Sequence, residues 1–342
     1  MTPAPPFEIP QRDYEVRTML KYGALLASAA GSKDFHRPGR KSHLPRSGAT
    51  GAAIGEIVHR MKITVTHSTT YRYDFPVFLE RHIFRLRPRM TSSQRLTAFD
   101  IQIAPTPAGT TECLDQDGNL AVNAWFNAPT KELSVVSRFT VEMLQQNPFD
   151  YVLVGESLNL PLWYREPLCA ALTPYRNDAH VAESVKQYAK SIAASAQWNT
   201  LSFLMALTRQ IFQTCRQVIR PNGPPWPSDQ TLSLLEGSCR DLAVLFCDAC
   251  RVMGIAARFV SGYECASANR QDSYMHAWAE VYLPGIGWRG YDPARGLAVS
   301  NGHVAVAAGF DYDLASPVAG WYSGGARSQM EASLHLQVDD AG

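Results

Sequence analysis

Three side chains in the second half of the chain could together perform nucleophilic catalysis: Cys239, His276 and Asp292. A thiolate attacks amide and ester carbonyls, a histidine can move the protons, and a carboxylate can hold the imidazole in the useful tautomer. Taken singly, each has an ordinary structural alternative, because cysteines in helices and histidines in strands are usually core residues. The sequence around each residue must therefore give a reason to group them.

Cys239 falls where a helix is expected to begin. Ser238 is a good N-cap, and Asp241 lies at the spacing that completes a capping box. Apolar residues then recur at helical spacing as far as Gly254, so we predict a helix from 239 to about 253. The first turn of a helix favours thiolate over thiol, and its N–H groups could stabilise an oxyanion.

His276 opens a predicted strand at 276–283, which follows another at 258–263. Side chains alternate between the two faces of a strand. One face of the second strand is purely apolar and is expected to be core: Ala277, Ala279, Val281 and Leu283. The other face is aromatic and polar, as the wall of a cleft would be: His276, Trp278, Glu280 and Tyr282.

Asp292 can reach His276 only in one register of the hairpin that joins 276–283 to 288–293. With a four-residue loop, paired residue numbers sum to 571, and His276 and Asp292 face opposite sides. With a three-residue turn at 284–286 they sum to 570, and Asp292 lies opposite Trp278, diagonal to His276 with Cβ atoms about 7 Å apart or less. We therefore predict an odd loop closed by a bulge at Gly287.

Two other clusters have the residue types of a metal site, but we interpret both as structural. Cys247 and Cys250 form a Cys-x-x-Cys pair, but they lie inside the helical pattern with no second pair nearby, so core packing is favoured over zinc. Asp115, Asp117 and Asn119 alternate as in a calcium loop. The required Gly and Glu positions hold other residues, so we predict a hairpin turn.

Composition narrows the class of protein. The 342 residues carry 32 Lys+Arg and 31 Asp+Glu, a balance that gives no field for nucleic acid or an anionic membrane. No apolar run approaches the twenty residues that span a bilayer. The odd number of cysteines, seven, argues against a disulfide framework and predicts a cytoplasmic protein. The apolar segment 23–30 is the alternative, a signal-peptide core, but acidic residues precede it.

The chain divides into four segments by pattern. We expect residues 1–60 to be an unstructured extension, with Met61 a candidate start of translation. Residues 61–150 predict a small antiparallel β-sandwich. Residues 151–322 predict an α+β domain, with helices at 181–195 and 201–218, and residues 323–342 a tail with one candidate strand.

These motifs, taken in order, resemble the transglutaminase-like superfamily in its bacterial and archaeal branch. The resemblance rests on GSCRD at 237–241, ARFVSGY at 257–263, HAWAEVY at 276–282 and GWRGYDP at 287–293. A looser likeness to the N-terminal β domain of the same bacterial proteins rests on YRYD at 71–74, RLRP at 85–88 and DGN at 117–119. One departure is Ala294, where the family commonly has Thr.

The resemblance implies a papain-like core: a helix that carries nucleophile Cys239, packed on an antiparallel sheet that carries His276 as base and acid and Asp292 as its orienting carboxylate. It implies neither a cofactor nor a metal. We expect a thioester acyl-enzyme and a peptide or protein substrate, with hydrolysis favoured over cross-linking. The alternatives are a non-catalytic binding module on the same fold and an enzyme whose β domain recruits its substrate. Four aromatic residues could line the substrate cleft or belong to the core: Trp226, Trp278, Trp288 and Tyr291.

Overall fold

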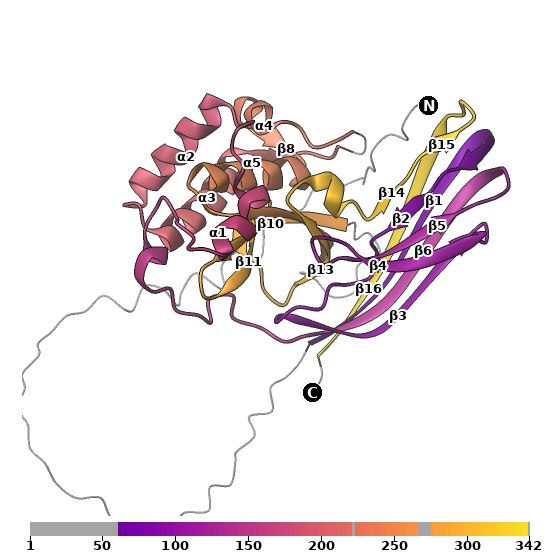
Figure 1. The fold of residues 1–342 in the computed structure, drawn as a ribbon, viewed down its shortest axis with the longest axis horizontal. Coiled ribbons are helices and arrows are strands. Elements are labelled where there is room, and N and C mark those ends of the chain that lie inside the picture. The colour runs from indigo at the N-terminus through magenta and orange to yellow at the C-terminus, as the bar shows by residue number, and fades with distance from the viewer. Residues whose placement is uncertain (1–60, 221–222, 266–274, 341–342) are drawn as a thin grey trace, which may run out of the picture.

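The structure is a computed structural model that describes residues 61–220, 223–265 and 275–340. The extension predicted at 1–60 lies outside the described residues. A helical layer, a five-stranded sheet and a domain of long strands follow one another across the molecule (Figure 1). The predicted α+β core behind an antiparallel β domain is thus confirmed.

The β domain contains two antiparallel sheets. The first joins five strands: β15 (Tyr322–Ser323), β16 (Ser328–Asp340), β1 (Met61–Leu79), β6 (Thr130–Met143) and β3 (Gln94–Ala104). The second joins β14 (Val318–Ala319), β2 (His82–Phe84), β5 (Leu120–Trp125) and β4 (Gly109–Leu114). Apolar side chains of both sheets, among them Leu133 and Phe84, share one core. The predicted turn between β4 and β5 is confirmed, with Gly118 at φ +76°.

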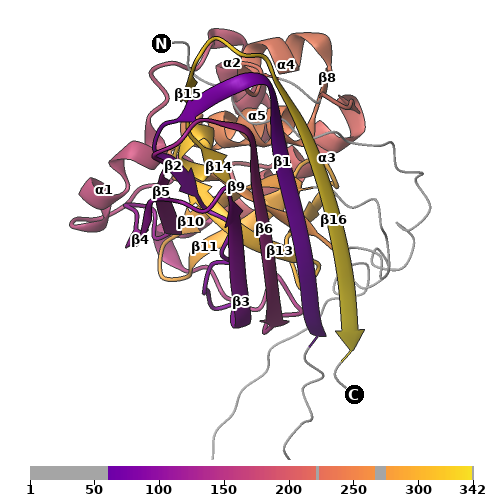
Figure 2. The same cartoon turned by 90° about the vertical axis from the view of Figure 1, so that its right-hand side faces the viewer.

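The C-terminal segment is an integral part of the β domain. The candidate strand at 323–342 exists as β16, which pairs with β1 from Met61↔Asp340 to Tyr73↔Ser328. Figure 2 shows β16 running alongside β1, far from it in sequence. Its Leu334 and Leu336 are buried. The β domain is therefore built from two segments of the chain, whereas the sequence predicted one at 61–150 and a separate tail.

In the α+β domain, helices cover one face of a sheet. Its longer helices are α2 (Glu183–Ser195), α3 (Thr200–Thr214), α4 (Ser228–Leu234) and α5 (Cys239–Val252). The sheet has the order β12 (Leu297–Ala298), β11 (Gly287–Asp292), β10 (Met275–Leu283), β9 (Ala257–Glu264) and β13 (His303–Gly309). Short elements complete it: 3-10 helices η2 (Gly155–Leu158), η3 (Thr173–Arg176) and η4 (Tyr312–Ala315), helix α1 (Leu168–Ala171) and strands β7 (Arg216–Gln217) and β8 (Glu236–Gly237).

Helix α3 ends four residues before the predicted end at 218. Cys215 is already extended, and β7 pairs in parallel with β8, the strand that leads into α5. The chain beyond Thr214 therefore continues as a strand rather than as another helical turn. This pairing places the residues before Cys239 beside the end of α3.

Both faces of the five-stranded sheet are covered. Ala277, Ala279, Val281 and Leu283 of β10 pack with the buried side of α5, as their alternation predicted. The opposite face meets the β domain, where Gln94 donates its side-chain amide to the carbonyl of Ala305 at 2.8 Å and Asn119 donates to the carbonyl of Ala308 at 2.7 Å. These contacts fix the β domain against the sheet that carries His276.

Candidate active site

The start of α5 is held by one buried carboxylate. Asp241 Oδ2 accepts hydrogen bonds from the backbone N–H and the hydroxyl of Ser238, at 2.6 and 2.7 Å. Its Oδ1 accepts the N–H of Trp226 at 2.7 Å and pairs with Arg220. The predicted capping arrangement of Ser238 and Asp241 is confirmed, and it ties the helix start to the segment before α4. Cys239 is consequently fixed in position as the first residue of α5.

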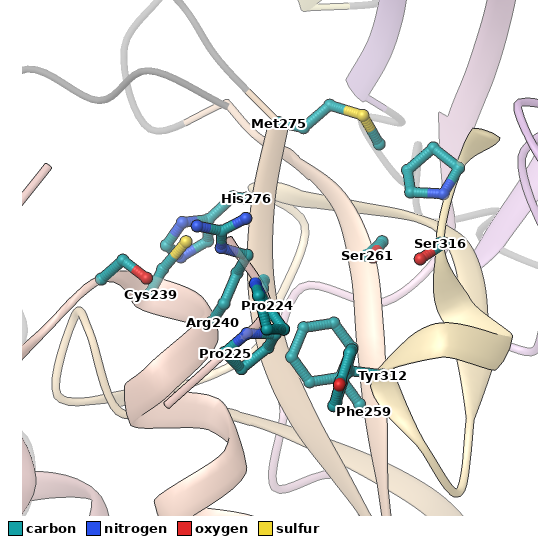
Figure 3. Close-up of a pocket in the computed structure, with 13 residues that line it drawn as sticks. Pro224, Pro225, Cys239, Arg240, Phe259, Ser261, Met275, His276, Tyr312 and Ser316 are labelled. Atoms are coloured by element: carbon teal, nitrogen blue, oxygen red, sulfur yellow. The ribbon is translucent and has the colours of Figure 1, made fainter. Parts of the chain in front are cut away.

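The side chains of Cys239 and His276 lie next to each other (Figure 3). A hydrogen bond between them contributes to the pKa shifts of both groups. Burial alone would raise the pKa of the Cys239 thiol, which is 2% exposed. The His276 imidazole, the Arg240 charge and the N–H of Ala277 outweigh burial and lower that pKa below its usual value. Burial would lower the pKa of His276, but Asp292 and Cys239 raise it to about 10. The two shifts act in the same sense, because each favours the thiolate and imidazolium form of the pair over its neutral form.

The hairpin between β10 and β11 has the register that the triad requires. The pairs run from Leu283↔Gly287 to Ala279↔Tyr291, and each sums to 570. Gly287 adopts φ +88°, a conformation that glycine reaches without strain, and it closes the three-residue turn. The predicted odd loop is confirmed, and Asp292 comes to the face that carries His276.

Asp292 is fully buried and accepts hydrogen bonds on both oxygens. Oδ2 lies 2.7 Å from His276 Nε2, while Oδ1 accepts the N–H groups of Ala294 at 2.9 Å and Arg295 at 3.2 Å. Burial would raise the pKa of Asp292, but His276 and His303 hold it well below the usual range. Because Nε2 of His276 serves the carboxylate, Nδ1 is the nitrogen left for Cys239. The Ala294 contact is made by backbone, so the missing family hydroxyl is not needed for it.

A second histidine, His303, contacts the same carboxylate, and this contact was not predicted from the sequence. Its Nε2 lies 3.0 Å from Asp292 Oδ2. His303 begins β13, which was not predicted, although the apolar run 304–308 after the Asn301-Gly302 turn carried a strand signal. Nothing local in the sequence indicates that β13 pairs with β9 beside β10.

A narrow pocket opens beside Cys239 and His276 (Figure 3). Its volume is about 40 Å³, and Arg240 is its one charged lining side chain besides the reacting pair among the described residues. Apolar groups form most of the remaining wall: Pro224, Pro225, Phe259, Met275, Tyr312 and Pro317. The pocket is thus suited to one small group next to the sulfur.

The four aromatic residues proposed for the cleft do not line this pocket. Trp278 and Tyr291 are each 1% exposed, Trp278 in the layer against the β domain and Tyr291 stacked on Phe246 of α5. Trp288 packs with Arg258 at 4.0 Å, and Trp226 with Arg220 at 4.2 Å. Trp278 and Tyr291 are thus buried residues, and none of the four aromatic side chains lies at the wall of the pocket beside Cys239.

Metal ligation has one candidate among the described residues. His276, Asp292 and His303 present three ligand atoms within 4.8 Å of one another. The two hydrogen bonds to Asp292 account for this spacing, so we assign the group to proton handling. Cys247 and Cys250 are buried free thiols of α5, and burial raises the pKa of each, as expected for core residues. Within the described ranges, no helix has the length and apolar character to traverse a bilayer.

Two family descriptions match the chain. Residues 63–142 match the "Bacterial transglutaminase-like N-terminal region", and residues 186–293 match the "Transglutaminase-like superfamily". The second match contains Cys239, His276 and Asp292.

Similar proteins extend over most of the chain. An uncharacterized protein of Mycobacterium leprae is 24% identical over 290 residues, which cover 80% of this chain and 98% of that protein. An uncharacterized protein of Mycobacterium tuberculosis is 26% identical over 294 residues, which cover 81% of this chain and 92% of that protein. A solved structure from Cytophaga hutchinsonii, titled "a Putative Cysteine Protease", has 21% identity and a TM-score of 0.59, and covers 82% of this chain and 98% of that one. The fold is therefore shared along both domains.

Proposed function

Because the chain belongs to the transglutaminase-like superfamily, we propose that it catalyses acyl transfer on amide bonds through Cys239, His276 and Asp292. The observation that carries the proposal is the hydrogen-bonded chain from thiol to imidazole to carboxylate, buried at the side of a pocket. It lowers the pKa of Cys239 and raises that of His276, and so favours the thiolate and imidazolium forms that start such a reaction.

The first half-reaction would form a thioester. The thiolate of Cys239 attacks the amide carbonyl, and the first turn of α5 offers N–H groups and a positive dipole end to the oxyanion. His276 then gives its proton to the departing amine as the C–N bond breaks. Asp292 keeps Nε2 protonated and Nδ1 turned to the sulfur throughout.

We favour water as the second acceptor, so that the net reaction is hydrolysis. A cavity of about 40 Å³ beside the sulfur has room for a water molecule, which the neutral His276 would deprotonate as it attacks the thioester. The cysteine-protease title of the Cytophaga hutchinsonii structure agrees with this choice. The substrate would be a peptide or protein, and the free state of all seven cysteines supports a cytoplasmic location.

His303 would act as a positioning residue for Asp292. A carboxylate oxygen that accepts from two imidazoles cannot rotate away from one without losing the other. This role requires no contact with substrate.

Trapping the acyl-enzyme tests the proposal and separates the two outcomes. The protein is incubated with a peptide mixture and a primary-amine probe, and both Cys239 adducts and released products are identified by mass spectrometry. We expect an acyl group on Cys239 and hydrolysed peptide without probe transfer, both absent in Cys239→Ala and retained in Cys113→Ser. Probe-labelled peptide would make the enzyme a transamidase, and a chain with neither adduct nor product would be a binding module.

A further inference from the structure

A second, larger cavity lies behind the candidate active site, between the two domains. Its volume is about 390 Å³, in the range of small-molecule sites. One wall is the face of the sheet turned away from α5, with Trp278 of β10 and His303 of β13, and the other wall includes segment 89–94 of the β domain. We propose that this cavity binds a small organic carboxylate with an apolar body, and the claim goes beyond the proposed peptidase function.

Three arginines and one carboxylate line the cavity: Arg89, Arg258, Arg289 and Glu280. Glu280 pairs with Arg258, which leaves a positive excess. Arg89 is the arginine on the β-domain wall. Its Nη atoms donate to neutral acceptors, the side-chain oxygen of Asn119 and, at 3.0 Å, the carbonyl of Asp117. Its Nε is buried and has no hydrogen-bond partner. Burial lowers the pKa of Arg89, and the charge of Arg258 lowers it further. A cation in this situation favours an anionic guest.

Two of the three carboxylates that act on the pKa of Arg89 are paired with other arginines. Glu280 accepts two hydrogen bonds from Arg258, at 2.8 and 2.6 Å, and Asp115 pairs with Arg85 at 3.0 Å. The third, Asp117, accepts the hydroxyl of Tyr175 on Oδ1 at 2.6 Å, while its Oδ2 is buried without a partner. Among the described residues, none of the acidic groups approaches Arg89 to ion-pair distance, so its charge remains available to a ligand.

The wall opposite Arg89 contains a second hydrogen-bond donor without an acceptor. Trp278 is 1% exposed, lines the cavity, and its indole Nε1 has no hydrogen-bond partner. A buried donor without an acceptor costs about 1–3 kcal/mol, so an acceptor-rich guest is favoured. The apolar part of such a guest would meet the walls around these donors, which include Trp288, Val299 and Ala305. Donors with apolar walls are the pattern of a site for an amphipathic carboxylate.

The cavity also touches the candidate catalytic group. His303 lines it, and the Nδ1 of His303 is buried without a partner while its Nε2 contacts Asp292. A guest in the cavity would therefore lie next to the imidazole that holds the orienting carboxylate.

Calorimetric titration with benzoate, benzamide and acetate tests the site. Benzamide has the shape of benzoate without its charge, and acetate has the charge without the ring. We expect benzoate to bind and to raise the melting temperature, while benzamide does not bind and acetate binds more weakly. Arg89→Lys and Trp278→Phe should each weaken benzoate binding about tenfold, because each removes one charge-assisted or buried hydrogen bond. The exposed Arg138→Lys should bind like the parent.

Three results would overturn the proposal. The first is the absence of binding heat with benzoate at up to about 500 times the protein concentration, which would indicate a site filled by water alone. The second is equal binding of benzamide, and the third is unchanged benzoate affinity in both cavity variants. If the variants do not fold, the benzoate and benzamide comparison on the parent still decides. A Cys239→Ala background, which lacks the nucleophile, should bind benzoate as the parent does. Binding thus stands or falls independently of the proposed reaction.

Discussion

The Nε2 atom of His303 lies 3.0 Å from Asp292 Oδ2, the same oxygen that His276 Nε2 contacts at 2.7 Å. Both ring nitrogens must donate, because an ionised carboxylate only accepts. The two histidines come from β13 and β10, which lie on either side of β9, so the sheet itself sets their separation. The orientation of Asp292 is therefore defined by three strands rather than by the β10–β11 hairpin alone.

Removing the His303 donor should slow catalysis without weakening substrate binding. In His303→Met the carboxylate loses one hydrogen bond, and a hydrogen bond to a charged group is worth about 1.5–3 kcal/mol, so we expect kcat to fall about tenfold or more with KM little changed. His303→Gln can place an amide N–H near the same point and should restore most of the rate. Steady-state kinetics on a peptide substrate checks this. Equal loss in both variants would show that the imidazole serves packing only.

Replacing the carboxylate itself should have a larger effect. Asp292→Asn can donate to His276 Nε2, which leaves the imidazole in the wrong tautomer, and we expect kcat to fall on the order of 10³ to 10⁴. The fold should persist, because Asn retains an oxygen for the N–H groups of Ala294 and Arg295. The rate is compared with the melting temperature of the same sample. A loss of less than tenfold in a folded variant would remove Asp292 from the mechanism.

The pH profile of kcat/KM should be broad on its alkaline side. The pKa of Cys239 is lowered, so activity should rise as pH increases through a value below 9.0, the ordinary value. The pKa of His276 is raised to about 10, so the leaving-group proton should be lost only as pH passes that value. Arg240→Gln removes a nearby positive charge and should move the acid limb to higher pH. Arg216→Gln, an exposed pair with Glu236, should leave it in place; identical profiles for the two variants would contradict the role of Arg240.

The close approach of three strands leaves no room at Gly262, which lies opposite His276. A Cβ there would overlap the carbonyl of Val304 and the indole of Trp278. We expect Gly262→Ala to lower the free energy of unfolding by about 1–3 kcal/mol in a urea titration. Gly302→Ala, with open space around its Cβ, is the control and should stay within about 0.5 kcal/mol of the parent. Equal stability of both variants would mean that the sheet packs differently here.

The site was predictable where chemistry depends on local sequence. The capping of α5 by Ser238 and Asp241 follows from residues three apart, and the β10–β11 register follows from the turn at Gly287. Alternation also identified the apolar face of β10 correctly. These features involve neighbours in the chain, whose geometry the residue types largely determine.

What escaped prediction depends on contacts between distant segments. The pairing of β16 with β1 joins residues more than 250 positions apart, and nothing in either strand specifies its partner. The same holds for His303, which reaches Asp292 only because β13 pairs with β9. Alternation placed Trp278 on the polar face of β10 but could not reveal that the β domain covers that face.

The reactivity of Cys239 with iodoacetamide shows whether His276 activates this thiol. Alkylation rates are measured from pH 5 to about 10, site by site by mass spectrometry, in the parent and in His276→Gln, with exposed Cys113 as an internal reference. We predict that the midpoint of Cys239 alkylation in the parent lies below the ordinary thiol value of 9.0, and that it rises in His276→Gln, where burial is no longer opposed by the imidazolium. Cys113 should react alike in both. A Cys239 that alkylates no faster at pH 7 than Cys113, with the same pH dependence in His276→Gln, would contradict the account.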